Sequence, residues 1–398
     1  MEFSRRAQDV APFYAMEYGR RAAELEAQGV SVVKLNIGEP DFGAPPAFLA
    51  RIRELSDGRP LPYTGALGID ELRRAIADFS RDHFDAPIDP GRVVVTTGAS
   101  AALLLACAAL VNPGDEVLVA DPSYPCNRSF AAGFGAEVTL LSTGPQRRFQ
   151  LDARSVADAW TERTRGVMIA SPSNPTGTSI PYDELVATVR TVEQRGGWRI
   201  VDEIYLGLAD DADGHGPRSI AADDPGAVVV NSFSKYFGMT GWRLGWAVVP
   251  DEMVGIAEKL AQNYYVCPPT PAQWAALECF TPETLALAQA RRAVLRRRRQ
   301  LVLDGLARIG LPVPVIPDGA FYVYVDVSGT GMTASQFCDR ALTHAQVALT
   351  PGKDFGDEGA EQYVRLSYAT GEDDLALGLE RLGELVGRPG LEPGTSGL

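Results

Sequence analysis

Seven short runs rich in β-branched residues lie between residues 92 and 250. They occupy residues 92–97, 116–120, 137–141, 166–170, 198–202, 227–231 and 244–249. The runs are apolar along their length, as expected of strands that are covered on both faces. Helical patterns, for example at 99–110 and 182–195, separate most of them. This alternation predicts an α/β fold with a seven-stranded, mainly parallel sheet.

The C-terminal third has a different pattern. A long helical stretch is followed by two apolar strand candidates, at residues 320–327 and 363–368, so this part is predicted to be α+β. A single hydrophobic core rarely keeps growing in a chain of 398 residues, and two domains are therefore expected. We assign residues 46–285 to a large domain, and residues 1–45 together with 286–398 to a small one.

The long helical stretch carries four consecutive arginines, Arg296–Arg299. Four consecutive residues point all round a helix axis, so these arginines are expected on a solvated helix surface and not in a nucleic-acid patch. The last residues, from 387 onwards, are expected to form a frayed tail.

Composition excludes several classes of function. The 37 basic and 51 acidic residues give a formal net charge of −14, which argues against nucleic acid or an anionic membrane as a partner. The longest apolar stretch is too short to cross a bilayer, and the N-terminus has no signal-peptide core. Five scattered cysteines and three histidines favour reduced thiols and no metal site. A cytoplasmic protein is expected.

Polar residues cluster directly after several of the predicted strands. These clusters lie at residues 98–100, 121–124, 171–177, 202–205 and 232–235. In parallel α/β sheets, ligands bind beyond the carboxyl ends of the strands. The sequence therefore predicts a ligand site at this edge of the sheet.

The last cluster opens the segment NSFSKYFGMTGWRLGW, residues 231–246. The hydroxyls of Ser232 and Ser234 and the guanidinium of Arg243 suit a phosphate group. Lys235 is one of only four lysines among 37 basic residues, and lysine is the side chain that forms a Schiff base with an aldehyde. Together these residues indicate an aldehyde cofactor that is anchored by its phosphate and bound to Lys235.

This segment and six others resemble the class I/II aminotransferases, the pyridoxal-phosphate enzymes of fold type I that include aspartate aminotransferase. The other six, in the family's order, are LNIGEPDF (35–42), YTGALGIDEL (63–72), SPSNPTG (171–177), VDEIY (201–205), DGAFY (318–322) and VRLSYA (364–369). The resemblance runs from about residue 12 to about residue 386. It implies pyridoxal 5′-phosphate as cofactor. It also implies ping-pong transfer of an amino group between an L-amino acid and a 2-oxo acid through a Schiff base on Lys235.

The resemblance also implies roles for single residues around the cofactor ring. Lys235 would carry the cofactor and move the α-proton. Asp202 would keep the pyridine nitrogen protonated, so that the ring accepts electrons. Tyr205 and Asn174 would hydrogen-bond to the phenolic oxygen, and Tyr124 would stack on the ring.

Phosphate binding is shared in the same family. The residues implied are Gly98, Ala99, Ser100, Ser232, Ser234, Arg243 and Tyr63. The first three open a predicted helix, whose free amides and positive dipole end suit a dianion. Tyr63 resembles the residue that reaches the phosphate from the neighbouring subunit, which implies a homodimer with composite sites.

Arg365 corresponds to the arginine that binds the α-carboxylate of the substrate in a two-pronged contact. A structural salt bridge is the alternative role for such an arginine in an apolar strand. The backbone of Gly38, with Tyr124 and Asn174, would lie at the same substrate.

No second arginine can be assigned to a carboxylate on the substrate's side chain. The aromatic residues Phe13, Tyr14, Tyr264 and Tyr265 favour amino acids with neutral or aromatic side chains over dicarboxylates. Tyr236 stands where many relatives have a small residue, which predicts altered packing behind Lys235.

Two other functions remain open at this point. The same scaffold serves lyases and decarboxylases, because the cofactor can labilise any bond of the α-carbon. A binding or regulatory protein of this fold is disfavoured, because Lys235, Asp202 and Arg365 are all present.

Overall fold

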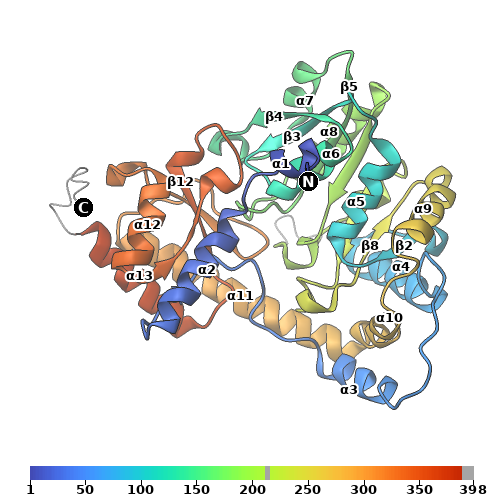
Figure 1. Ribbon diagram of the computed structural model, residues 1–398, viewed down its shortest axis with the longest axis horizontal. Coiled ribbons are helices and arrows are strands. Elements are labelled where there is room, and N and C mark those ends of the chain that lie inside the picture. The colour runs from blue at the N-terminus through green and yellow to red at the C-terminus, as the bar shows by residue number, and fades with distance from the viewer. Residues whose placement is uncertain (211–215, 388–398) are drawn as a thin grey trace.

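A seven-stranded sheet forms the centre of the larger part of the protein. The computed structural model describes residues 1–210 and 216–387 (Figure 1). The strands of the large sheet are β2 (Val93–Thr96), β3 (Glu116–Asp121), β4 (Glu137–Ser142), β5 (Thr164–Ala170), β6 (Trp198–Asp202), β7 (Val228–Ser232) and β8 (Gly245–Val248). Their order is β2-β8-β7-β6-β5-β3-β4, and only the pairs with β8 are antiparallel. The predicted fold class is therefore confirmed.

Helices cover both faces of this sheet. The helices of the described chain are α1 (Arg5–Asp9), α2 (Tyr14–Ala27), α3 (Pro46–Leu55), α4 (Asp70–Phe84), α5 (Ala99–Leu110), α6 (Pro125–Gly133), α7 (Ala153–Ala159), α8 (Tyr182–Gln194), α9 (Asp251–Tyr264), α10 (Thr270–Ala276), α11 (Pro282–Arg308), α12 (Ala334–His344) and α13 (Glu372–Val386). Helices α5 and α9 pack on one face, and α4, α8 and α10 pack on the other. Because both faces are buried, the inner strands carry valine and isoleucine on both sides. Strand β4 lies at the sheet edge and is correspondingly half-exposed.

A smaller α+β unit follows in the C-terminal part. Strand β12 (Tyr363–Ser367) lies between β9 (Tyr322–Asp326) and β11 (Thr350–Pro351) in an antiparallel sheet. A second pair joins β1 (Val33–Lys34) to β10 (Val347–Ala348) in parallel. The N-terminal segment thus packs with the C-terminal third. Figure 1 shows α11 running from α10 beside the large sheet to α13 on the smaller unit.

The arginine run on α11 is more buried than expected. Arg298 is 8% exposed, and its Nη1 donates to Oδ1 of Asp41 at 2.8 Å. Arg296 and Arg299 bind the two carboxylate oxygens of Asp210, at 2.8 and 2.6 Å. The prediction of a solvated surface is therefore wrong for Arg298, because the run holds α11 to two loops. The expected tail, from residue 388 onwards, lies outside the described residues.

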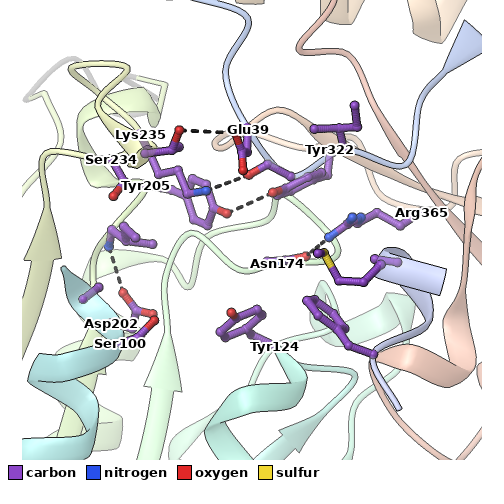
Figure 2. A pocket seen from close by; sticks show the side chains of 18 of the residues that line it. Glu39, Ser100, Tyr124, Asn174, Asp202, Tyr205, Ser234, Lys235, Tyr322 and Arg365 are labelled. Carbon is purple, nitrogen blue, oxygen red and sulfur yellow. Dashed lines mark hydrogen bonds between the residues drawn. The ribbon is translucent and has the colours of Figure 1, made fainter. Parts of the chain in front are cut away.

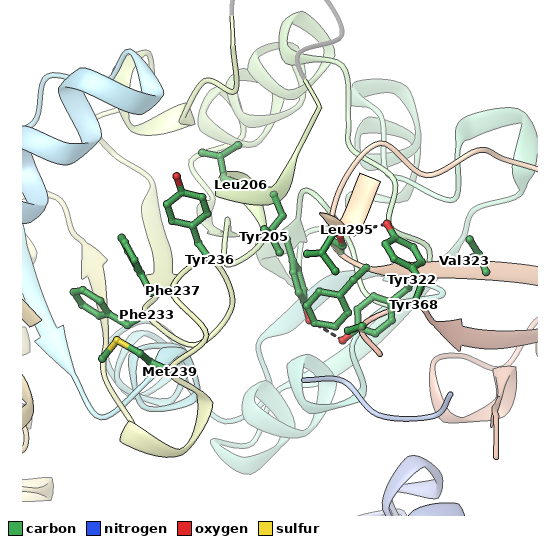
Figure 3. Close-up of a cluster of buried hydrophobic side chains, with 14 of the residues drawn as sticks. Tyr205, Leu206, Phe233, Tyr236, Phe237, Met239, Leu295, Tyr322, Val323 and Tyr368 are labelled. Atoms are coloured by element: carbon green, nitrogen blue, oxygen red, sulfur yellow. Dashed lines mark hydrogen bonds between the residues drawn. The ribbon is translucent and has the colours of Figure 1, made fainter. Parts of the chain in front are cut away.

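A buried aromatic cluster packs against the loop that follows β7 and carries Lys235 (Figure 3). Phe233 and Phe237 pack with ring centroids 5.5 Å apart. Tyr236, predicted to alter the packing here, is 7% exposed and accepts a hydrogen bond from Nε2 of Gln289 at 2.8 Å. A Cβ atom at Gly207 would lie 2.8 Å from the Tyr236 ring. This glycine therefore provides the space for the tyrosine, and the cluster makes a rigid base for the loop.

Across the described residues, no helix has both the length and the apolar character required to cross a membrane.

Candidate active site

One cavity of about 780 Å³ lies at the carboxyl ends of the large sheet's strands and also touches the smaller unit. The predicted site residues that line it are Gly38, Ala99, Ser100, Tyr124, Asn174, Asp202, Tyr205, Ser234, Lys235, Arg243 and Arg365. They come from segments that are far apart in the sequence. In Figure 2 the side chains of Lys235, Asp202 and Arg365 reach the cavity from different sides. The structure therefore brings most of the predicted site together.

Three predicted residues do not line the cavity. Ser232 is buried just beneath it, and its hydroxyl donates to Oγ of Ser234 at 2.8 Å. Gly98 lies behind Arg243, where a Cβ atom would come within 2.6 Å of Nη2. Tyr63 is 81% exposed and lies on the surface of the single chain. Ser232 and Gly98 thus contact residues that form the cavity wall. A role for Tyr63 requires a second subunit.

The amine of Lys235 lies inside the cavity. Its Nζ donates a hydrogen bond to the carbonyl oxygen of Gly38 at 2.6 Å, and it lies 5.9 Å from the centroid of the Tyr205 ring. Burial, together with the guanidinium groups of Arg365 and Arg243, lowers the pKa of Lys235 to about 8, while the carboxylates of Glu39 and Asp202 oppose the shift. A larger fraction of neutral, nucleophilic amine is therefore present near neutral pH than for an exposed lysine.

Asp202 ends β6 and points into the same space. Its Oδ1 accepts a hydrogen bond from the backbone N–H of Ile204 at 3.0 Å. Burial raises the pKa of Asp202 to about 6, while the Ile204 amide and Lys235 act in the opposite direction. A buried carboxylate with one amide partner is poised to bind a cationic ring nitrogen.

Donors for an anion gather where α5 begins. Ser100, Ser234 and Arg243 line this part of the cavity, and within the described chain no side chain caps α5. Arg243 has a left-handed backbone with φ of 50°, a strained conformation that an arginine rarely adopts. It lies against Gly98, whose φ of 84° also requires glycine. Free helix amides, two hydroxyls and a guanidinium fit a phosphate dianion.

Arg365 is 2% exposed and lies on β12, the central strand of the small sheet. Its Nη1 donates to Oδ1 of Asn174 at 2.9 Å, and its Nη2 donates to the carbonyl oxygen of Asn36 at 2.7 Å. The guanidinium carbon lies 4.5 Å from the centroid of the Tyr322 ring. Arg365 forms no ion pair with any described residue, and its Nε is buried without a partner. The structural salt bridge is therefore excluded within the described chain, and the charge is available to an anionic ligand.

Comparisons with known proteins agree with this geometry. The family model of the class I and II aminotransferases matches residues 30–382. The chain belongs to the class I and II aminotransferases.

Individual relatives cover almost the whole chain. A valine–pyruvate aminotransferase of Mycobacterium tuberculosis is 42% identical over 377 residues, which are 94% of this chain and 96% of the relative. An aspartate/prephenate aminotransferase of Thermus thermophilus is 38% identical over 391 residues, which are 97% and 99% of the two chains. The crystal structure of an aminotransferase from Mycobacterium tuberculosis matches with a TM-score of 0.92 and 40% identity, and covers 97% of this chain and 99% of its own. The enzyme is therefore an aminotransferase of fold type I, and the lyase and decarboxylase alternatives are not supported.

Two residues of this aminotransferase were not predicted. Tyr322 lies in the segment DGAFY, and the sequence alone predicts no role for it. Its hydroxyl lies 3.0 Å from that of Tyr205, and its ring packs beneath Arg365. Glu39 lines the cavity and accepts a hydrogen bond from Oγ1 of Thr240 at 3.2 Å. Both residues occur within family segments, and only their place in the fold reveals the contacts.

The predicted aromatic pocket of the aminotransferase forms only in part. Phe13 lines the cavity, as do Met16 and Ile37. Tyr14 and Tyr265 do not line it, and Tyr264 is 56% exposed. Within one chain, Phe13 is thus the only one of the four aromatic residues at the site.

Proposed function

We propose that amino-group transfer takes place in this cavity on pyridoxal 5′-phosphate, which is held covalently by Lys235 as a Schiff base. The observation that carries the proposal is that Lys235, Asp202 and Arg365 line one cavity. An amine, a carboxylate and a guanidinium that has no ion-pair partner among the described residues therefore face the same cavity. These are the groups needed for an aldehyde, a pyridine nitrogen and a substrate carboxylate.

The remaining lining residues fit the rest of the cofactor. Ser100, Ser234, Arg243 and the amides at the start of α5 would hold its phosphate, with Ser232 and Gly98 in support. Tyr124 would lie against its ring. When bound, the cofactor supplies an aldehyde carbon and a ring that accepts electrons from the α-carbon of the amino acid.

The chain's own side chains would bind and orient the amino acid. Arg365 would bind the α-carboxylate with its guanidinium, and Asn174 and Asn36 would keep that group in place through the hydrogen bonds described above. Once free, Nζ of Lys235 would accept the proton from Cα of the amino donor. Asp202 would remain ionised beside a protonated ring nitrogen, and Tyr205 would donate its hydroxyl hydrogen to the phenolic oxygen.

We further propose donors with neutral or aromatic side chains. Arg243 and Arg365 are assigned to the phosphate and the α-carboxylate, which leaves Arg20 as the remaining arginine of the lining. Arg20 already forms an ion pair with Glu24, and its side chain is 63% exposed. The names of the relatives differ on this point, since one names valine and the other aspartate. The apolar lining by Phe13 and Met16 is what supports neutral side chains.

The assembly and location remain proposals as well. A homodimer would place Tyr63 of one subunit at the phosphate of the other. Exposed apolar side chains lie at residues 61–63 and 264–266, among them Leu61, Tyr63, Tyr264 and Val266. They support a second copy of the chain that would cover these side chains. We also retain the two-domain division at residues 45 and 285, and a cytoplasmic location.

The test is a spectrum of the purified holoenzyme titrated with single amino acids. An aminotransferase loses the absorbance of the lysine-bound cofactor when a donor is added and regains it when a 2-oxo acid is added. We expect this cycle with leucine or phenylalanine at lower concentrations than with aspartate or glutamate. A holoenzyme that responds by far best to aspartate or glutamate would overturn the proposed donor class. The absence of any bound cofactor would overturn the proposed site.

A further inference from the structure

The first turn of α2 is held by a carboxylate from a distant loop. Oδ1 of Asp354 accepts a hydrogen bond from the backbone N–H of Tyr14 at 2.9 Å, and Oδ2 accepts one from Ala15 at 3.1 Å. Asp354 is 2% exposed and forms no ion pair with the described residues. Two helix amides and the helix dipole therefore stabilise its buried charge. Lys353, the preceding residue, places Nζ 4.2 Å from the centroid of the Tyr14 ring.

This turn forms a wall of the cavity. Phe13, Ala15 and Met16 line it, and the Phe13 ring stands edge-on to Tyr124 with the centroids 6.3 Å apart. Phe13 occupies the N-cap position of α2, and its side chain makes no capping hydrogen bond. A phenylalanine cannot accept a hydrogen bond there, so the cap must come from elsewhere in the chain. Asp354 supplies it.

The loop that carries Asp354 is fixed to the large sheet on its other side. Oδ2 of Asp121, at the end of β3, accepts hydrogen bonds from the backbone N–H groups of Asp357 and Glu358 at 3.0 and 3.1 Å. A Cβ atom at Gly356 would lie 1.6 Å from Oδ1 of Asp121, so only glycine allows this approach. The loop thus joins the large sheet to the wall of the cavity.

Arg365 is connected to the same turn. The carbonyl oxygen of Asn36 accepts from Nη2 of Arg365, and Nδ2 of Asn36 donates to the carbonyl oxygen of Ala15 at 3.0 Å. Asn36 is 3% exposed. Asn36 therefore links the guanidinium of Arg365, which we propose binds the α-carboxylate, to the first turn of α2. This turn is the wall of the cavity that the side chain of the amino acid would contact. A shift of the wall changes the space available beside a carboxylate held on Arg365.

We propose that Asp354 is a positioning residue for the side chain of the amino donor: by capping α2, it fixes Phe13 and Met16 as the surface against which that side chain packs. The inference rests on the proposed function of the cavity as an amino-donor site. Asp354 acts through α2, not through contact with the reacting atoms. A large apolar side chain such as that of leucine reaches this wall, whereas the methyl group of alanine makes little use of it.

The test is the variant Asp354→Asn in the holoenzyme. Asparagine keeps the volume but supplies one acceptor oxygen and no charge, so one of the two amides loses its partner. Rapid mixing with leucine or alanine alone, followed at the cofactor absorbance, gives an apparent Kd and a maximal rate for each donor. We expect the apparent Kd for leucine to rise about five- to tenfold. The free energy that a helix cap contributes corresponds to about this factor in an equilibrium constant. The maximal rate with leucine, and both constants for alanine, are expected to stay within about twofold.

Two further variants make the result specific. Asp152→Asn is the matched control, because Asp152 caps α7 through the backbone N–H of Ser155 at 2.6 Å and does not line the cavity. It should leave the ratio of leucine to alanine affinity unchanged. Phe13→Ala removes the wall without removing the cap, and should lower the same ratio even if Asp354→Asn folds poorly.

Hydrogen exchange gives a readout that does not depend on activity. Amides of residues 13–20 should exchange faster in Asp354→Asn than in the wild type, while those of α5 stay unchanged. Equal losses for leucine and alanine, or unchanged exchange at residues 13–20, would overturn the proposal. Failure of the proposed function gives a different result: the wild-type holoenzyme would convert neither donor, although the exchange difference would still be present.

Discussion

Nη1 of Arg365 donates a hydrogen bond of 2.9 Å to Oδ1 of Asn174, 191 positions away. Arg365 lies on β12 of the small sheet, whereas Asn174 lies in the loop that follows β5 of the large sheet. The bond fixes the plane of the guanidinium. Nε remains buried and without a partner. The chain thus holds a prearranged cation over the cavity, and an anion that binds there meets a group whose orientation is already set.

Replacement of Arg365 by lysine tests this arrangement. An ammonium keeps the charge but not the fork, so we expect kcat/KM for every amino donor to fall about ten- to hundredfold. The absorbance of the bound cofactor should not change. Steady-state rates with several donors measure the effect. An unchanged kcat/KM would contradict the role of Arg365 in carboxylate binding.

Lys235→Ala should abolish turnover and the absorbance of the covalently held cofactor, because no other described lysine lines the cavity to supply the amine for a Schiff base. Lys259→Ala, on the outer part of α9, is the matched control and should behave like the wild type. Borohydride reduction followed by peptide mass analysis provides an independent check. It should label Lys235 in the wild type and nothing in Lys235→Ala.

The pKa of Lys235, lowered to about 8 by burial, predicts a pH dependence of cofactor attachment. The neutral amine is the reactive form, so the rate at which the cofactor-free chain takes up the cofactor should rise through pH 8 and then level off. A rise that continues towards pH 10.5 would contradict the lowered pKa.

The free energy of unfolding of the cofactor-free protein should depend on pH through the same titration of Lys235. Between about pH 8 and 10.5 the unfolded chain holds a proton on Lys235 that the folded chain has lost, so the free energy of unfolding rises with pH in this window. Lys235→Met lacks this group. The stability advantage of Lys235→Met over the wild type should therefore be largest below pH 8 and shrink above it, as measured by urea unfolding without cofactor.

Gly98→Ala is expected to weaken cofactor binding. The new Cβ atom would come within 2.6 Å of Nη2 of Arg243, and the φ of 84° strains any residue other than glycine by about 1–3 kcal/mol. Gly255→Ala is the control, because this glycine lies in α9 with open space around it and alanine should stabilise the helix by about 1 kcal/mol. Thermal unfolding and cofactor titration distinguish the two variants.

Mixed subunits can test the proposed role of Tyr63. If Tyr63 acts across a dimer interface, subunits carrying Tyr63→Ala and subunits carrying Lys235→Ala should together form one intact site per mixed dimer. Activity at low cofactor concentration should then exceed that of either variant alone. If the mixture is no more active than the sum of its parts, Tyr63 does not act in the neighbouring site.

The strands of the large sheet were predicted to within a few residues, because each is a short apolar run, and five of the seven runs are followed by a polar cluster. The site was predicted largely through resemblance, and the structure brings Lys235, Asp202 and Arg365 to one cavity. The roles of these residues, like the domain boundaries, remain predictions. Arg298 was misplaced, because its partner Asp41 lies in a loop far away in the sequence.

Contacts between distant segments have no local signature, which explains what was missed. Tyr322 approaches Tyr205 only after β9 is placed beside the large sheet. Asp354 caps a helix that begins 340 positions earlier, whereas a local cap such as Asp152 lies next to its helix in the sequence. Sequence patterns and propensities describe neighbours along the chain. A local cap such as Asp152 can therefore be predicted from the sequence, whereas a distant cap such as Asp354 cannot.

The small sheet has a consequence for the order of events during synthesis. Strand β12 is its central strand and carries Arg365, while the neighbouring wall of the cavity includes Phe13. A growing chain that still lacks β12 has neither the sheet nor the guanidinium, even when its large sheet is complete. The proposed site for the amino acid is thus complete only after residues 363–367 have left the ribosome, and a nascent chain could hold the cofactor on its large sheet before it can bind a substrate carboxylate.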